Sequence, residues 1–518
     1  MGERVHRSVM NIKVGMFFYV LSLFLAFFSR KIFLDCLGAE FIGLTGMLMN
    51  IMSFLSVAEL GIGTSISFFL YKPLQEDNHE RINEVMSILA YLYRFIGYII
   101  GFCGLIISLF FPWWFDGLTV GLSLVYFTFY SFLATSMSGY IFNYKQLLVV
   151  ANQKQYLVNA YFQSIGIAQS IIQIFLAYNY HNLYLWVLVG LIFTIIGIIV
   201  FNYRIRQLYP WLKISIKEGH QNLKNYPEIL KKTRQIFIQR IKDFILYRSD
   251  EILVGAFVSV VQVAFYGNYT IITNKLNFLV NILSDGMSAG VGNLVAEGNV
   301  QNTMKVFWEL TIIRFFIAGA IVYGILLFIQ PVIFYWLGPK YLLDDLIVYL
   351  LSLNIFIMIS RGAIEIFVAA YGVFSDIWAA WAELIINLSI TICLAPHYGI
   401  IGILLGKIIS VATISLIWRP YFLFSQGMHI PAKKYWLEVW PAYLSFIIFA
   451  TIIIIVRLYL INPYFNDIAL LTTYGLLCYP LILICFFLTM FYSTKGAKYF
   501  AARIPTVYHF LTINKKYE

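Results

Sequence analysis

Long apolar runs, broken by short polar or turn-rich stretches, make up most of this chain of 518 residues. About 20 consecutive apolar residues are enough for one helix to cross a bilayer. Read in this way, the pattern predicts an all-α, polytopic membrane protein with about 14 transmembrane helices. Their expected ranges are 12–34, 40–71, 82–111, 117–142, 147–177, 182–204, 236–258, 263–296, 305–330, 342–371, 375–395, 399–424, 437–461 and 467–492.

The longest polar segment, roughly 203–235, lies between the sixth and seventh expected helices, and the other loops are too short for a soluble domain. We therefore expect four parts. They are a six-helix lobe at 1–204, a basic cytoplasmic linker at 205–235, a second six-helix lobe at 236–424, and helices 13 and 14 with a basic cytoplasmic tail at 425–518.

Two stretches of the chain resemble each other and indicate an internal repeat. The first begins at EFIGL, contains ELGIG and ends in YLYR at Arg94; the second begins at AFYGN, contains SDGMSAG and ends in TIIR at Arg314. Six crossings return the chain to the side from which it started. The two lobes would then be parallel repeats about an axis along the membrane normal, as expected of a transporter with a central cavity.

The composition supports this interpretation, with 61% apolar and 12% charged residues. A soluble domain is nearer half apolar and about a quarter charged, so a soluble enzyme is excluded. Five scattered cysteines without a CxxC pair indicate neither a disulfide framework nor a zinc site,. The amino terminus, MGERVHRSVMNIK, leads into an apolar run without a small-residue cleavage site, and we expect a retained first helix there,.

The formal net charge of +11 could indicate nucleic acid, but membrane topology explains most of it. If the amino terminus is cytoplasmic, the expected cytoplasmic segments hold about 24 Lys and Arg and the opposite side about three. Cytoplasmic loops of membrane proteins are enriched in basic residues. This bias predicts that both termini are cytoplasmic and makes a nucleic-acid partner unnecessary.

The remaining basic residues lie inside or at the ends of expected helices, where an ionisable group is costly unless it faces a cavity or a partner. Each is therefore a candidate for function. They are Arg94, Arg240, Lys242, Arg248, Lys275, Arg314, Arg361, Lys407 and Arg457.

Arg94 and Arg314 lie at matching points of the two repeats. They could face one cavity and bind phosphate oxygens bidentately, or each could form an ion pair inside its own lobe. Arg248, Asp250 and Glu251 lie near the middle of the seventh helix. They could line a water-filled space or form an ion-paired cluster that fixes the helix to a neighbour.

Arg361 and Glu365 are four residues apart on one helical face, the spacing of a self-contained ion pair,. Arg30 and Lys31 end the first helix on the outer side, where they could extend to the interface or receive a phosphate,.

Lys275 and Lys407 are expected to face the cavity, whereas Arg457 is expected to extend to the interface,. Glu59 and Asp285 lie beside glycines of the repeat. They could bind a coupling cation, form a gate, or simply occupy positions where small residues allow close helix packing.

Aromatic clusters such as FPWWF at 111–115 are spaced like the belts at membrane surfaces, although aromatic rings in a cavity could also stack on sugars,. The sequence has no P-loop, HExxH, GxSxG or Gly-rich nucleotide motif in a polar context,. No motif supports ATP hydrolysis or glycosyl transfer, and we expect a transporter rather than an enzyme.

Several of these segments carry a resemblance to a known family. They are EFIGL, VAFYGNY, YRSDEILVG at 247–255 and NLSITICLAPHYGIIGILLGKIIS at 387–410. Together with two six-helix repeats and a final helix pair, the chain resembles the polysaccharide, or O-antigen, flippases of the multidrug/oligosaccharidyl-lipid/polysaccharide (MOP) exporter superfamily. The resemblance covers nearly the whole chain.

The resemblance implies a bacterial inner-membrane protein that moves an undecaprenyl-pyrophosphate-linked oligosaccharide to the periplasmic leaflet by alternating access. It implies no cofactor beyond a coupling ion such as H⁺ or Na⁺, and a polysaccharide polymerase and glycosyltransferases as partners besides the lipid-linked substrate and the bilayer. The implied cavity cations are Arg30, Arg94, Arg248, Lys275, Arg314, Arg361 and Lys407. The candidate coupling or gating carboxylates are Glu59, Asp250, Glu251, Asp285 and Glu365.

Three alternatives remain open at this point. A multidrug exporter of the same superfamily usually has twelve helices and an acidic pocket, which fits the cationic interior less well. A peptidoglycan lipid-precursor flippase has fourteen helices and a cationic lining, so the sequence separates it only weakly. A polysaccharide polymerase or O-antigen ligase would need a large periplasmic loop, and the outer loops here are short.

Overall fold

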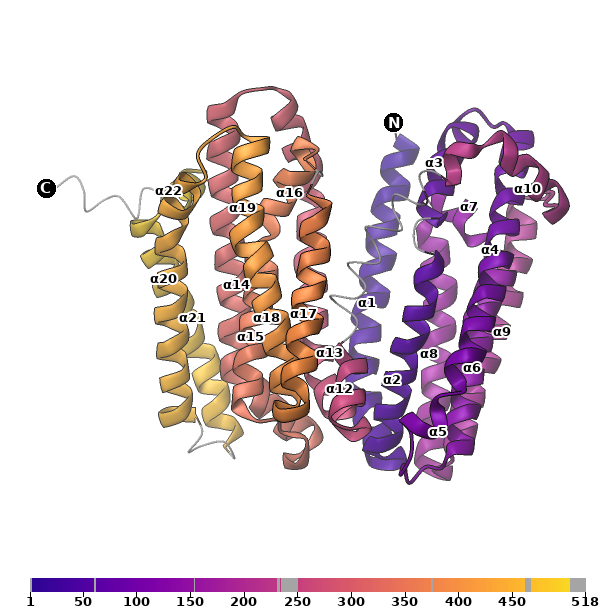
Figure 1. Ribbon diagram of the computed structural model, residues 1–518, viewed down its shortest axis with the longest axis horizontal. Coiled ribbons are helices and arrows are strands. Elements are labelled where there is room, and N and C mark those ends of the chain that lie inside the picture. Colours follow the sequence, from indigo (N-terminus) through magenta and orange to yellow (C-terminus); the bar gives the residue numbers. More distant parts are fainter. Residues whose placement is uncertain are drawn as a thin grey trace, which may run out of the picture. The chain divides into compact units, whose positions relative to one another are not determined.

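The computed structural model describes residues 2–59, 62–152, 154–230, 233, 250–373, 376–461 and 467–503 (Figure 1). Within these residues the regular secondary structure is helical, without strands. Ten of the helices described there are long and apolar enough to cross a membrane. The expected fold class, an all-α multi-pass membrane protein, is confirmed, and the figure of fourteen crossings stays a prediction.

The chain divides into two compact units, residues 1–264 and 265–518. Unit 1 begins with one long helix and continues through antiparallel helices joined by short turns. Its helices are α1 (Gly2–Leu37), α2 (Ala39–Leu55), the 3₁₀ turn η1 (Ser56–Glu59), α3 (Ile62–Gln75), α4 (His79–Ser108), α5 (Phe111–Trp114), α6 (Leu122–Phe142), α7 (Gln146–Ala151), α8 (Gln155–Tyr180), α9 (Leu183–Leu208), α10 (Ile216–Asn222), η2 (Leu223–Asn225) and α12 (Asp250–Phe257).

Helix α13 (Val260–Ala296) starts in unit 1 and continues into unit 2. The other helices of unit 2 are α14 (Val300–Leu337), η3 (Pro339–Tyr341), α15 (Asp345–Ser360), α16 (Gly362–Tyr371), α17 (Ile377–Tyr398), α18 (Ile400–Val411), the π-helix η4 (Ala412–Trp418), α19 (Arg419–Phe422), η5 (Leu423–Gly427), α20 (Lys433–Val456), η6 (Arg457–Ile461), α21 (Ile468–Ser493) and α22 (Lys495–Ala502).

Where the structure describes an expected span, it contains one helix or a short series of helices. The expected span 40–71 is divided into α2 and α3 by the turn that ends at Glu59, and the span 342–371 is divided into α15 and α16 at Arg361. Most of the expected span 236–258 lies outside the described residues. Candidate residues thus lie at both of these helix breaks.

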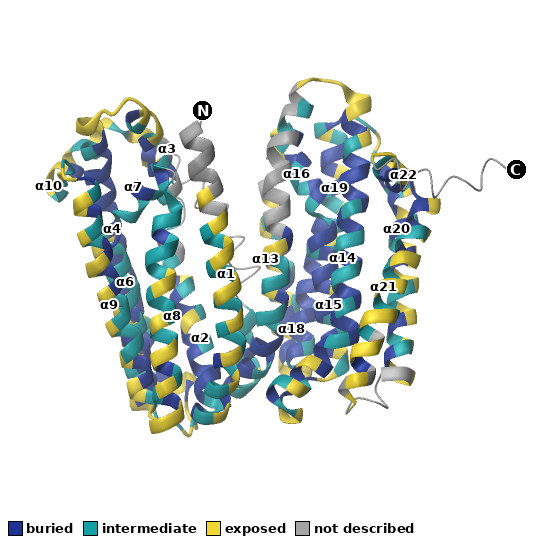
Figure 2. Ribbon diagram, turned by 180° about the vertical axis from the view of Figure 1, so that it is seen from behind, coloured by how far each residue is buried: buried dark blue, intermediate teal, exposed yellow. Residues whose placement is uncertain are grey.

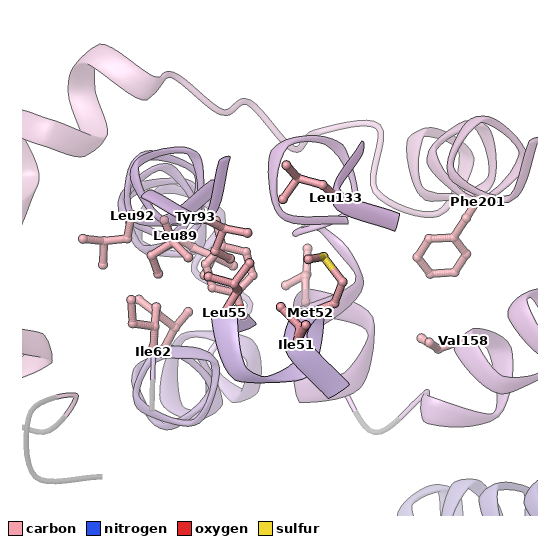
Figure 3. Packing of buried hydrophobic residues seen from close by; sticks show 14 of the residues in the cluster. Ile51, Met52, Leu55, Ile62, Leu89, Leu92, Tyr93, Leu133, Val158 and Phe201 are labelled. Atoms are coloured by element: carbon pink, nitrogen blue, oxygen red, sulfur yellow. The ribbon is translucent and has the colours of Figure 1, made fainter. Parts of the chain in front are cut away.

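The core of unit 1 is formed by the facing sides of α2, α3, α4 and α6 (Figure 3). Leu55, Ile62, Leu89 and Leu133 are buried there, and the ring of Tyr93 lies among them. On α2 the buried residues Leu44, Leu48, Ile51 and Leu55 are three or four residues apart, the spacing of one buried helical face,.

The opposite faces of several helices are exposed (Figure 2), and many of the side chains there are apolar. On α9, for example, Ile192, Ile195 and Ile199 are exposed at helical spacing, and Ile199 is 63% exposed. Such faces are stable in lipid but not in water. The many apolar residues of the sequence are therefore found on these exposed faces as well as in the core.

In unit 2, α17 and α18 are an antiparallel pair in very close contact. A Cβ atom added to Gly402 would lie 2.5 Å from the Leu394 carbonyl carbon, and one added to Gly406 would lie 2.4 Å from Thr391 Oγ1. The two glycines are four residues apart on one face of α18, the spacing that lets membrane helices approach closely.

Replacing Gly402 with alanine is expected to destabilise unit 2. The three nearest atoms to the added methyl group belong to the backbone of Leu394 and Ala395 and cannot rotate away. Overpacking of this kind costs about 1–3 kcal/mol, and we expect a lower midpoint of thermal unfolding in detergent. Gly166→Ala in α8 is the matched control, because no atom lies within 4 Å of its added Cβ. Equal midpoints for the two variants would contradict this interpretation.

Each unit also has a short helix that crosses the first part of a long helix. In unit 1, an added Cβ on Gly219 of α10 would lie 2.1 Å from the Ser87 carbonyl oxygen of α4. In unit 2, one on Gly496 of α22 would lie 2.3 Å from the Trp308 carbonyl oxygen of α14. Ser87 and Trp308 each lie eight residues after the first residue of their helix. We call α10 and α22 the clamp helices.

The segment expected as a linker, 205–235, is therefore folded over much of its length. The Lys213 amide donates to Asn83 Oδ1 at 3.0 Å, and the Tyr226 hydroxyl donates to Glu84 Oε2 at 2.8 Å. The imidazole of His79 stacks on the Trp211 ring with centroids 3.8 Å apart. These contacts attach residues 209–226 to the first turns of α4, which extend beyond the apolar part of that helix.

Candidate functional site

Arg314 is a buried cation in the middle of α14, with 5% of its side chain exposed. Its guanidinium lies against Gly362, the first residue of α16, and a Cβ atom there would be 2.9 Å from Arg314 Cζ. The glycine at the break between α15 and α16 thus leaves the space that the guanidinium occupies.

Arg361, the residue before that glycine, points toward other helices. Its Nη1 donates to Ser415 Oγ at 2.5 Å and lies 4.0 Å from Glu383 Oε1 on α17. Glu383 is 4% exposed. Arg314 and Arg361 are therefore brought to the same helix break, and a buried carboxylate faces the second of them.

Arg419 forms ion pairs with two further carboxylates near α16. Its Nη1 lies 3.4 Å from Asp376 Oδ2, and its Nε lies 4.0 Å from Glu365 Oε1. We call Arg361, Glu365, Asp376, Glu383 and Arg419 the charged cluster. The ion pairs described for Arg361 and Glu365 thus reach other helices, whereas their spacing predicted a pair within one helix.

Three members of the charged cluster, Asp376, Glu383 and Arg419, were absent from the sequence-based candidates. The signal was available for one of them, because Glu383 lies in the middle of the expected span 375–395. An acid in the middle of an apolar span is as costly as a cation there and is equally a candidate. Asp376 and Arg419 lie at helix ends, where charged residues are common and carry little information.

Two further expected cations lie on neighbouring helices of unit 2. Lys407 follows Gly406 on α18 and is 5% exposed. Lys275 lies on α13 and is half-buried. Asp285 belongs to the same helix, but its side chain lies outside the described residues.

In unit 1, Arg30 of α1 donates from Nη2 to the Ala264 carbonyl oxygen at 3.0 Å, while Lys31 is exposed. Asp250 is the first residue of α12, and Glu251 Oε2 accepts a hydrogen bond from Asn50 Nδ2 at 2.6 Å. Arg248 lies outside the described residues.

Glu59 lies at the break between α2 and α3. Its Oε1 accepts a hydrogen bond of 2.5 Å from the Tyr93 hydroxyl of α4. A Cβ atom on Gly63 would be 3.0 Å from that hydroxyl and 3.3 Å from Glu59 Oε1. The glycine beside this carboxylate therefore has a packing role, one of the alternatives that the sequence left open.

Arg94 follows Tyr93 on α4 and is half-buried, without an ion pair to any residue that the structure describes. Arg314, its counterpart in the repeat, is buried. The two positions that the sequence matched are therefore different in their surroundings.

The expectation that Arg457 extends to the membrane interface is wrong. Its side chain is 2% exposed and forms an ion pair with Asp345 at the start of α15. The physical reason is a nearby carboxylate: Asp345 supplies a partner inside the protein, so the guanidinium does not have to reach the interface.

The described residues contain no group of three or more His, Cys, Asp and Glu side chains that could hold a metal ion. What they do contain is guanidinium and ammonium groups inside apolar helices, which bind phosphate oxygens well. Such groups can bind an anion.

No protein-family model and no curated protein matches the sequence. Among solved structures, the chain is similar to "Lipid II flippase MurJ, inward closed conformation", with a TM-score of 0.60, 16% identity, and coverage of 93% of this chain and 99% of that one. It is also similar to an inward-facing multidrug resistance MATE family transporter of the MOP superfamily, with a TM-score of 0.55, 15% identity, and coverage of 79% and 97%. The chain therefore has the fold of MOP-superfamily transporters.

Proposed function

We propose that the protein is a flippase that moves an undecaprenyl-pyrophosphate-linked oligosaccharide from the cytoplasmic to the periplasmic leaflet by alternating access. The observation that carries this proposal is Arg314. This residue is a cation in the middle of the apolar helix α14, and it is 5% exposed. A buried cation in a transmembrane helix is costly and marks a pathway for charge by default.

The chemistry of the substrate agrees with this assignment. A pyrophosphate is a strong anion that must cross a region of low dielectric constant, where guanidinium and ammonium groups can compensate its charge. Lys407 is a second buried cation in the same unit. The polyprenyl tail can remain in the bilayer during the transfer, so only the headgroup needs a polar path.

The likeness to known transporters supports a flippase over a multidrug exporter. The structural match to the lipid II flippase covers 93% of this chain. The match to the MATE transporter covers 79% of this chain and 97% of that transporter. About a fifth of the chain is thus additional to that transporter. A carrier of cationic drugs would also gain nothing from a buried arginine.

A peptidoglycan lipid-precursor flippase is the second candidate, and the same structural likeness favours it. Its substrate has the same polyprenyl pyrophosphate and differs in the sugar and peptide part. The two functions differ in their consequences for the cell, since loss of peptidoglycan precursor stops growth and loss of one surface polysaccharide does not.

Depletion of the protein in its own cells tests the proposal. We expect lipid-linked oligosaccharide to accumulate facing the cytoplasm and the surface polysaccharide to disappear while the cells remain viable. Loss of viability with accumulation of lipid-linked peptidoglycan precursor would identify the second candidate. Normal glycan together with raised drug sensitivity would exclude both and indicate an exporter.

A further inference from the structure

Unit 1 has a group of cations at one end that the proposed translocation path does not use. This end is where α3 ends and α4 begins, and we call it the basic end. It carries Lys72, Arg81, Lys145, Lys154, Arg204, Arg206, Lys213, Lys217 and Lys224. The bias toward basic residues predicts that it faces the cytoplasm.

The packing of α4 on α6 gives the level of Arg94. A Cβ atom on Gly104 would contact Leu133, one on Gly101 would contact Met137, and one on Gly97 would lie 3.1 Å from Ile141 Cγ1. The two helices are therefore antiparallel, and residues closer to the start of α4 lie beside residues closer to the end of α6. One further turn places Arg94 level with the residues that follow Phe142, where α6 ends.

Arg94 thus lies near the boundary of the membrane rather than at its centre. The 30 residues of α4 have a length of about 45 Å, compared with about 30 Å for the hydrocarbon core,. The first turns of α4 extend past the end of α6 and are covered by residues 209–226 through the polar contacts described above.

Helices α6 and α9 pack side by side (Figure 1), and this packing brings two more cations to the level of Arg94. Asn202 Nδ2 of α9 donates to the Phe142 carbonyl oxygen at 3.0 Å. Lys145 follows Phe142 by less than one turn, and Arg206 follows Asn202 by about one turn of α9,. Lys145 therefore lies just after the end of α6, and Arg206 lies in the last turn of α9.

No carboxylate of the described residues forms an ion pair with Arg94, Lys145 or Arg206. Glu84 and Glu59 are hydrogen-bonded to Tyr226 and Tyr93 instead. Burial lowers the pKa of the Lys145 ammonium, and the nearby charge of Arg206 lowers it further. An anion placed between them would relieve this repulsion.

We propose that Arg94, Lys145 and Arg206 form a phosphate site for the headgroup of a lipid in the adjacent leaflet. The three cations come from α4, from the turn between α6 and α7, and from the last turn of α9, and they lie at one level at the basic end of unit 1. The chemical class of the ligand is a lipid phosphate or pyrophosphate, and a phospholipid and a polyprenyl pyrophosphate share that group.

Lipid binding to the full-length protein in detergent tests this site by native mass spectrometry. The probes are phosphatidylglycerol, undecaprenyl pyrophosphate and inorganic pyrophosphate. Replacing Lys145 and Arg206 together with glutamine is expected to lower the affinity for at least one of the two lipids by roughly tenfold or more, because each lost charge-assisted hydrogen bond is strong. Lys213→Gln with Lys217→Gln is the matched control, since both side chains are exposed at the same basic end.

The outcomes separate the site from its ligand. If the Lys145/Arg206 variant loses affinity for both lipids and the control variant does not, the site is a general phospholipid site. If the Lys145/Arg206 variant loses affinity only for undecaprenyl pyrophosphate, the site is specific for that carrier. Equal losses in the control variant would overturn the proposal, because they would show a diffuse charge effect. Binding of inorganic pyrophosphate without either lipid would also overturn it. The measurement requires no translocation, so it is independent of the flippase function.

Discussion

Replacing Arg314 with glutamine is expected to abolish surface polysaccharide while the protein is still inserted in the membrane. The variant keeps a polar side chain, shorter and with two N–H donors in place of five, and removes its charge. In a buried site, compensation of a pyrophosphate by guanidinium is worth about 1.5–3 kcal/mol for each charged hydrogen bond, so transport should fall by roughly tenfold or more. Lipid-linked glycan facing the cytoplasm should accumulate, as measured by its access to a membrane-impermeant reagent.

Lys305→Gln provides the matched control, because this lysine lies earlier on α14, carries the same charge and is exposed. It should leave the glycan unchanged. Folding is checked separately by thermal unfolding in detergent, and Arg314→Lys should recover part of the transport if charge is what matters. A well-folded Arg314→Gln protein that supports normal glycan would exclude Arg314 from the pathway.

The neighbouring glycine offers a second approach to the same site. Gly362→Ala changes no charge, but its Cβ would lie 2.9 Å from Arg314 Cζ and 3.1 Å from Nη1. Alanine there must displace the guanidinium. If the position of this group matters, Gly362→Ala should reduce transport in the same direction as Arg314→Gln.

Replacing Asp345 with alanine is expected to have the largest effect on stability. It removes the carboxylate that pairs with Arg457, whose side chain is 2% exposed. Removing this carboxylate leaves the Arg457 guanidinium without its partner, and because Asp345 itself is 38% exposed, the cost should lie below the about 3–5 kcal/mol of a fully buried pair,. The cost adds to the loss of a contact from Gln330, whose Nε2 lies 3.2 Å from Asp345 Oδ1. A marked fall in the thermal unfolding midpoint in detergent is the expected result.

Asp344→Ala is the control for this second prediction. Asp344 is the neighbouring residue and caps α15 by accepting a hydrogen bond from the Leu346 amide at 3.2 Å. Loss of a cap costs only about 1 kcal/mol. Moreover, Arg457→Met combined with Asp345→Leu should be more stable than Asp345→Ala alone, because no buried charge remains. A double variant that is less stable than the single one would contradict the assigned role of the pair.

The sequence predicted the fold class well because the requirement for long apolar helices in a bilayer is strong and local. The described helices follow the expected spans. The breaks at Glu59 and Arg361, however, lie inside segments that were each expected as one helix. A hydropathy pattern measures the apolar length of a segment and is insensitive to short turns within it, so it could not show these breaks.

The partners of the candidate side chains were much less accessible to sequence analysis. Arg361 has the spacing for a pair with Glu365, but its described carboxylate partner is Glu383 on another helix. Arg457 has an acid too, at a distance of more than a hundred residues along the chain. Contacts of this kind depend on the rotation of each helix about its axis, which the packing of several helices decides together.

The clamp helices have a consequence for the order in which the protein forms. Because α10 follows α9 directly, it leaves the ribosome before any residue of unit 2 has been made, and its contact with α4 uses only residues already synthesised. Unit 1 can therefore close its own fold while translation continues. The counterpart α22 is the last described helix, and its contact with α14 can form only after the other described helices of unit 2 have been made. Each half of the molecule thus carries its own closing step.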